Sequence, residues 1–107
     1  MAQAYEVFDG LSQQVPEIPA GSIVSRLVFT NPRLKVSVLG FAPGEKLTEG
    51  VPEEAAILEV WRGDGVVTLG DEAYEVGPGS WIFIDVGTPH TIEARGELVC
   101  LLTVLRA

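Results

Sequence analysis

The stretch GSWIFIDVGTPH, residues Gly79–His90, carries the strongest fold signal in the chain. Gly79 opens it, an apolar run follows, and Asp85-Val86-Gly87 ends that run before the chain reaches His90. A short apolar run bounded by glycine and proline is typical of a buried β-strand that ends in a turn. The stretch therefore predicts a strand over Trp81–Ile84, followed by a turn that leads to His90.

The same alternation of short apolar runs and Gly or Pro breaks extends in both directions from this stretch. Val, Ile, Leu, Phe and Thr fill the runs, while 12 glycines and 7 prolines punctuate the chain. No segment shows apolar residues at helical spacing over enough length to form a stable helix. The pattern predicts about eight strands of an antiparallel sandwich or barrel. The predicted strands are Ile23–Thr30, Leu34–Val38, Ala55–Trp61, Val66–Leu69, Glu72–Val76, Trp81–Ile84, Thr91–Glu93 and Glu97–Leu105.

Two segments predict more than the presence of a strand. Gly70-Asp71 joins two runs by two residues, which predicts a tight hairpin with a type II′ turn. Leu98–Leu105 is apolar on both alternating faces, although a half-solvated strand would be polar at every second position. Either a second sheet of the same chain or another subunit covers its outer face. We favour the subunit and expect a homodimer with an isologous contact.

Length sets the domain organisation. A chain of 107 residues is one domain, large enough to fold without disulfides or a structural metal. Pro16 and Pro19 interrupt the first segment, so we expect an irregular N-terminal arm over residues 1–21 and a barrel domain over residues 22–107.

Charge and hydropathy limit the partners. The 7 basic and 15 acidic residues give a net charge of −8, and no Lys/Arg cluster offsets it locally. Such a charge disfavours contact with nucleic acid and with anionic membranes. The N-terminus lacks the basic and apolar regions of a signal peptide, and the longest apolar-rich stretch is too short to span a bilayer. We therefore expect a cytoplasmic protein.

Two motifs resemble those of the cupin superfamily of small jelly-roll barrels. The family's first motif begins and ends with Gly and holds two His and a Glu; here Gly44 begins it and Gly63 ends it at the family's spacing. Gly79, Gly87 and His90 match the second motif. With the strand pattern on either side, the resemblance covers nearly the whole chain from residue 23 to residue 105. It implies an all-β fold, a cupin-like antiparallel jelly-roll β-barrel.

The resemblance fails at the metal ligands. In metal-bearing cupins, the two His and the Glu of the first motif bind one ion together with the His of the second. The corresponding residues here are Gly50, Pro52 and Ala56, and only His90 keeps its ligand type. Gly, Pro and Ala have no donor side chain, and one imidazole does not hold zinc, iron or manganese alone. The resemblance therefore implies a degenerate metal site, and we expect neither a metal nor another cofactor.

Acidic residues near the lost positions leave an alternative. Glu49, Glu53 and Glu54 flank these positions, and Asp85 lies near His90 in the sequence. Carboxylates with one His suit a hard ion such as manganese or magnesium, which would make the chain a metal-dependent cupin enzyme of the dioxygenase or isomerase type. Strand alternation, however, turns Glu49 away from the interior. The simpler interpretation is that these acids are solvated loop residues.

The lost ligands also predict empty space inside the barrel. An apolar cavity with one polar group is the usual form of a small-molecule site, and barrels of this size hold one small ligand. We expect His90 to hydrogen-bond the ligand, and Gly50, Ala56, Leu58 and Val60 to supply space and an apolar wall. The competing interpretation is a structural histidine on the barrel wall.

The face of the strand over residues 81–84 decides whether that space exists. Trp81 and Phe83 share one face of this strand, and the sequence does not determine which face points inward. If the two aromatic side chains pointed inward, the barrel would be filled and the protein would be a structural dimer.

Cys100 lies in an apolar run, which predicts a buried, unreactive thiol. Overall the residues favour a binding, accessory or regulatory module without redox chemistry over an enzyme.

Overall fold

The computed structural model describes residues 4–106. Within that range the regular structure consists of one short 3-10 helix and nine strands. They are η1 (Leu11–Gln14), β1 (Ile23–Thr30), β2 (Leu34–Phe41), β3 (Lys46–Glu49), β4 (Ala55–Arg62), β5 (Gly65–Leu69), β6 (Glu72–Val76), β7 (Trp81–Ile84), β8 (His90–Ala94) and β9 (Leu98–Leu105). None of the helical structure in this described part has the length and hydropathy needed to cross a bilayer.

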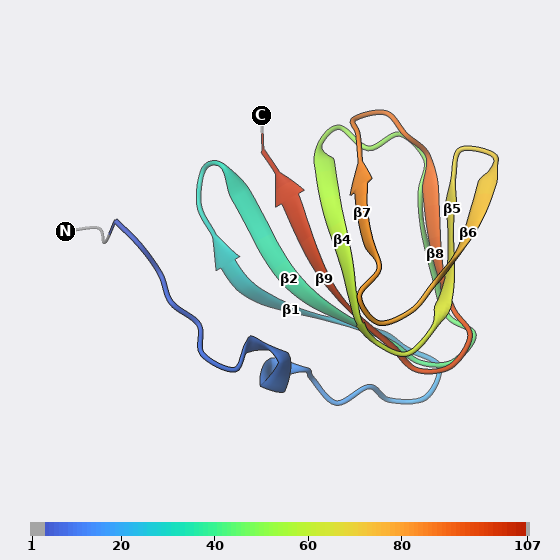
Figure 1. Cartoon of the computed structure of the whole chain (residues 1–107), viewed down its shortest axis with the longest axis horizontal. Coiled ribbons are helices and arrows are strands. Elements are labelled where there is room, and N and C mark those ends of the chain that lie inside the picture. The colour runs from blue at the N-terminus through green and yellow to red at the C-terminus, as the bar shows by residue number, and fades with distance from the viewer. Residues whose placement is uncertain (1–3, 107) are drawn as a thin grey trace.

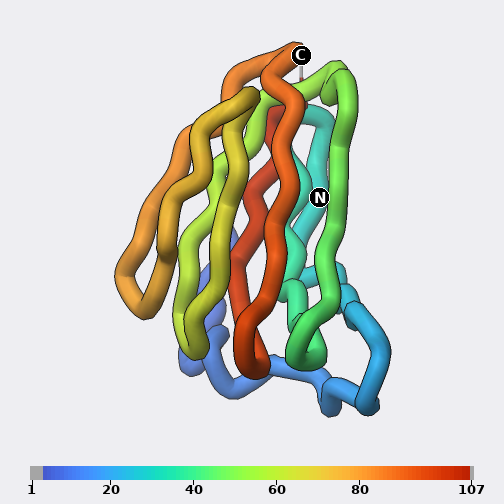
Figure 2. Tube along the Cα trace, turned by 90° about the vertical axis from the view of Figure 1, so that its right-hand side faces the viewer, coloured from blue at the N-terminus to red at the C-terminus, as the bar shows by residue number. Residues whose placement is uncertain are grey.

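The strands form two antiparallel sheets that face each other (Figures 1 and 2). One sheet has the order β1-β2-β9-β4-β7, and the other has the order β3-β8-β5-β6. Strands distant in sequence therefore lie side by side, as a jelly roll requires. Figure 1 shows the sheets separating toward the end that holds the β1–β2 hairpin and the C-terminus. The predicted all-β jelly-roll fold is confirmed.

Eight strands lie where the sequence predicts them, and β3 is an additional strand. Its sequence, Lys-Leu-Thr-Glu, contains a single apolar residue, which is too little for a hydrophobic pattern. Pairing with β8 makes it a strand, since Leu47 lies opposite the buried Ile92. The hairpin over Gly70-Asp71 has φ +60° at Gly70, as a type II′ turn requires.

Strand β2 extends beyond its predicted end because Gly40 continues the strand instead of breaking it. The side chain of Ile18, from the N-terminal segment, occupies the space that a Cβ at residue 40 would need. Glycine therefore allows the segment to cross the sheet closely. A glycine that serves close packing and a glycine that serves a turn are indistinguishable in the sequence.

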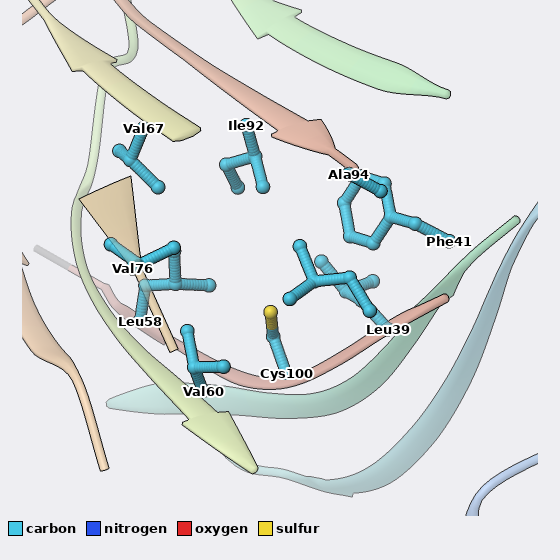
Figure 3. Packing of buried hydrophobic residues seen from close by; sticks show 10 residues of the cluster. Leu39, Phe41, Leu58, Val60, Val67, Val76, Ile92, Ala94 and Cys100 are labelled. Carbon is cyan, nitrogen blue, oxygen red and sulfur yellow. The ribbon is translucent and has the colours of Figure 1, made fainter. Parts of the chain in front are cut away.

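The hydrophobic core lies between the two sheets (Figure 3). It draws inward-facing residues from both sheets, at alternating positions of each strand. Its buried members are Leu39, Phe41, Leu58, Val60, Val67, Val76, Ile92, Ala94, Leu98 and Cys100. Aliphatic side chains thus fill the part of the barrel where the sheets lie close together.

The orientation of β7 answers the question that the sequence left open. Ile82 lies opposite the buried Leu58 in the β4–β7 ladder, and directly paired residues share a face of the sheet. Ile82 and Ile84 therefore point inward, while Trp81 and Phe83 point outward with 58% and 49% of their surface exposed. The two aromatic side chains do not fill the barrel.

The N-terminal segment covers part of the outer face of the five-stranded sheet. Phe8 packs edge-to-face against Phe29, with ring centroids 6.3 Å apart, and Ile18 packs over Gly40. Val99, paired with Gly40 on this face, is only 1% exposed. One end of β9 is thus covered by its own chain, and neither a second sheet nor a subunit is needed there. The remaining outward residues of β9 are half-buried: Leu101, Thr103 and Leu105.

Candidate functional site

A cavity of about 190 Å³ lies at the end of the barrel where the sheets separate. Residues from both sheets and from the β3–β4 connection surround it. They are Glu49, Pro52, Glu53, Glu54, Ala56, His90, Leu102 and Val104. Apolar side chains supply much of this wall, and acidic side chains and one imidazole supply its polar groups.

Strand register brings the apolar part of the cavity together. Ala56 of β4 lies opposite Val104 of β9, and Leu58 lies opposite Leu102. Because paired residues share a face, Ala56, Leu102 and Val104 form one apolar surface that continues into the core at Leu58. The cavity floor is therefore the outermost part of the same inward face that builds the core.

Glu49 faces the cavity, contrary to the expectation that strand alternation turns it away. It pairs with His90 in the β3–β8 ladder, so the two residues share the inward face of the smaller sheet. The expectation was wrong because it took residue 50 as the inward position, whereas β3 ends at Glu49 and Gly50 lies in the bend beyond it.

His90 is held by its own turn. Its Nδ1 lies 3.0 Å from the carbonyl oxygen of Thr88. A carbonyl oxygen only accepts hydrogen bonds, so Nδ1 carries the proton and donates it, which leaves Nε2 of the neutral ring as an acceptor. The turn is fixed at two further points, because the amide of Gly87 donates to Pro52 and the amide of Gly70 donates to Pro89, each at 2.8 Å.

The residues selected from the sequence occupy three different environments. His90 and Ala56 line the cavity. Leu58 and Val60 are fully buried in the core beneath it. Gly50 is exposed in the bend after β3 and does not line the cavity.

Sequence reasoning did not identify Leu102 and Val104 as part of the cavity wall. They belong to the apolar run of β9, whose two faces look alike in the sequence. Their inward orientation follows only from the register with β4, which is a long-range property. If Ala56 is known to point inward, the register of β4 against β9 identifies Leu102 and Val104 as inward residues too.

The residues present do not fit the metal site that the family resemblance implies. Gly50, Pro52 and Ala56 bring no donor atom to it. Among residues 4–106, no three His, Cys, Asp or Glu side chains are grouped so that they could hold a metal ion. Asp85, one of the acids considered for a rebuilt site, accepts a hydrogen bond from the amide of Val86 and does not line the cavity.

Cys100 is a core residue and not part of the site. Its side chain is fully buried between the sheets. Burial raises the pKa of the Cys100 thiol from 9.0 to about 12, because the apolar surroundings disfavour the thiolate. A thiol that stays protonated in the core is a poor nucleophile, so the predicted unreactive environment agrees with the structure.

The two-sheet barrel and its degenerate motif are those of a cupin. The family model described as "Cupin domain" matches residues 37–105, and the chain belongs to this family. The match runs from the middle of β2 to the end of β9 and covers every strand that lines the cavity.

Solved structures support the same assignment. The chain is similar to a conserved protein of unknown function from Streptococcus pyogenes, with a TM-score of 0.81, 25% identity and coverage of 100% of this chain and 91% of that one. A cupin superfamily protein from Desulfitobacterium hafniense has a TM-score of 0.84 at 20% identity and shares the fold, covering 100% of this chain and 95% of that one.

Curated relatives include the HTH-type transcriptional activator RhaR of Yersinia pestis and Yersinia pseudotuberculosis. Identity is 29% over 75 residues, which is 70% of this chain and 26% of RhaR. The chain thus spans about a quarter of the length of the curated relatives that it matches.

Proposed function

We propose that this cupin barrel binds a small molecule in the cavity at its mouth, as a binding, accessory or regulatory module without redox chemistry. One observation carries the proposal: an apolar floor of Ala56, Leu102 and Val104 faces a single imidazole across a cavity of about 190 Å³. An apolar pocket with few polar groups is the usual form of a small-molecule site. In this proposal neither a metal nor another cofactor takes part.

Each proposed site residue has a different role. His90 hydrogen-bonds the ligand through Nε2, since Nδ1 is already engaged by Thr88. The small side chain of Ala56 leaves space, and Gly50 keeps the exposed bend after Glu49 free of a side chain. Leu58 and Val60 support the apolar wall from the core below.

The likeness to part of a transcriptional activator favours the regulatory form of this proposal. In that form, ligand binding in the barrel changes how the module contacts a partner. The barrel itself does not contact nucleic acid, because its net charge of −8 repels phosphates. We place this activity in the barrel domain over residues 22–107 and in the cytoplasm. The N-terminal arm covers residues 1–21 in this proposal. Residues 1–3 and residue 107 are outside the range that the structure describes.

The outer face of the larger sheet supports the proposal that the protein is a homodimer. On this face Ile57 and Phe83 lie side by side in the β4–β7 ladder, and the β9 partner of Ile57 is Thr103, which the half-buried Leu101 and Leu105 flank. Exposed apolar side chains on one face of a sheet are typical of subunit contacts. An isologous contact through this face leaves both cavity mouths open.

The alternative, a metal-dependent cupin enzyme with a rebuilt site around His90, needs donors that converge on one ion. The acidic side chains near His90 do not form such a group in the described residues. We therefore place the metal-free binding module first.

Binding of a neutral probe tests the proposal. Isopentanol, a branched alcohol, should shift the amide NMR signals of the cavity strands in the wild-type protein. Ala56→Leu fills the cavity and should abolish these shifts, while Ala55→Leu places the same side chain on the outer face of β4 and should leave them unchanged. His90→Ala should weaken binding about three- to ten-fold through loss of one hydrogen bond. The proposal fails if neither isopentanol nor a charged probe of the same carbon skeleton binds, or if Ala56→Leu and His90→Ala both bind isopentanol like the wild type.

A further inference from the structure

The polar side-chain groups that line the cavity share one property, because all of them accept hydrogen bonds. Glu49, Glu53 and Glu54 present carboxylates, which only accept when ionised. His90 uses its N–H on the carbonyl of Thr88, so in the neutral ring its remaining nitrogen is also an acceptor. A ligand that satisfies this wall must bring the donors itself.

In the described part of the chain, no positive side chain forms an ion pair with the carboxylates of the cavity. Within residues 4–106 the one ion pair joins Arg95 to Glu75, at 2.6 Å, and neither residue lines the cavity. No Lys or Arg is among the described residues that line it. The carboxylates also stand in the field of a chain with net charge −8. The cavity mouth is therefore negative, and it favours a positively charged ligand over a neutral or anionic one.

The spacing of the hydrogen-bond acceptors around the cavity suits an organic cation better than a metal ion. The carboxylates and the imidazole surround the cavity, but in the described residues they are not grouped closely enough to coordinate one ion. An organic cation does not need every acceptor within bonding distance, because the three N–H donors of an ammonium group can bond the nearest acceptors while the other carboxylates attract it over a longer distance. The apolar floor of Ala56, Leu102 and Val104 requires a hydrocarbon body beneath that head group.

We infer that the cavity takes a small organic cation, a protonated primary amine carried on a compact apolar body. The body packs on the floor, and the three N–H donors of the ammonium group hydrogen-bond the nearest acceptors among the carboxylates of Glu49, Glu53 and Glu54 and Nε2 of His90. The remaining carboxylates attract the cation through their charge. This inference rests on the proposed function and names the chemical class of its ligand.

Three probes with the same branched five-carbon skeleton test the head group. Isopentylamine is a cation at neutral pH, isopentanol is neutral and isovalerate is an anion. We expect isopentylamine to bind about ten-fold more tightly than isopentanol in an NMR titration at low salt, because charge-assisted hydrogen bonds are stronger than neutral ones. Isovalerate should bind more weakly than isopentanol.

A triple variant links the preference to the cavity. Glu49→Gln, Glu53→Gln and Glu54→Gln together keep the size of the exposed side chains and remove their charge. This variant should bind isopentylamine no better than isopentanol, while the affinity for isopentanol stays unchanged. The matched control changes three exposed acids away from the cavity, Glu17, Glu72 and Glu97, to Gln. It alters the net charge equally and should keep the amine preference.

The outcomes distinguish failure of the inference alone from failure of the proposed function. If isopentanol or isovalerate binds as tightly as isopentylamine, the inference is wrong and the small-molecule site stands. If the control variant loses the preference as fully as the cavity variant, the net charge of the protein causes it and the inference is also wrong. If none of the three probes binds, both the inference and the proposed function fail.

Discussion

Gly63 shows at the scale of one residue why the cupin motif ends on glycine. Its φ is +83°, in the left-handed region that favours glycine. A Cβ at this position would also collide with the backbone carbonyl of Glu97, which connects β8 to β9. Gly63 therefore satisfies a conformational and a packing requirement together. Its neighbours in space come from a distant part of the chain, so this glycine helps to fix the closed end of the barrel.

Replacing Gly63 by Ala should lower the free energy of unfolding by about 2–4 kcal/mol, because both requirements are violated. Gly79→Ala is the matched control. Gly79 has a similar φ of +91°, but a Cβ there meets no atom within 4 Å. Its cost should be limited to backbone strain, about 1–2 kcal/mol. Urea denaturation measures both values, and equal losses in the two variants would refute the packing part of this explanation.

Cys100 makes stability depend on alkaline pH. The folded state keeps the thiol protonated up to a pKa of about 12, while the unfolded chain ionises near 9.0. The folded state therefore binds more protons above pH 9, and stability must fall as the pH rises from about 9 to about 12. Urea denaturation across this range should show the fall, and Cys100→Ala should make it shallower. A wild-type protein and a Cys100→Ala variant with the same pH dependence would contradict this assignment.

Strand β9 shows, at the scale of one element, which parts of the structure the sequence can predict. Its bounds and its two apolar faces follow from local composition, as do the bounds of most other strands. What covers each face is long-range information. The N-terminal segment buries Val99, and pairing with β4 directs Leu102 and Val104 into the cavity. Strand β3 was missed for the same reason, because its partner β8, and not its own pattern, makes it a strand.

The candidate site follows the same rule. Ala56 and His90 could be selected because the motif spacing places both inside the barrel, and both line the cavity. Leu58 shares the inward face with Ala56 but lies deeper, in the filled part of the core. Alternation predicts which face a residue occupies, but it does not predict how far the aliphatic core extends along the barrel.

The exposed face of β7 and β9 gives a prediction about assembly. If this face forms the homodimer contact, then Phe83→Asp places a charge in an apolar interface and should convert the dimer to a monomer. Phe83 points away from the core, so the variant should keep its fold and its ligand affinity. Sedimentation equilibrium measures the mass. A wild-type protein that is already monomeric, or a Phe83→Asp variant that stays dimeric, would exclude this face as the contact.

At the scale of the whole molecule, the structure keeps the cupin frame and changes the chemistry of its interior. The motif glycines, the turn before His90 and the paired sheets are present, while Gly50, Pro52 and Ala56 have removed the donors that a metal would need. The result is a cavity with an apolar floor and an acidic rim on a negatively charged barrel. On this frame we propose ligand binding rather than metal-dependent catalysis.

The measurement that tests this central claim most directly is the metal content of the purified protein, before and after dialysis against manganese, zinc and iron. The residues around the cavity predict a content near zero that stays near zero after each dialysis. About one bound ion per chain that disappears in His90→Ala would contradict the account. It would show that the acids around His90 rebuild the site, and it would establish the metal-dependent alternative.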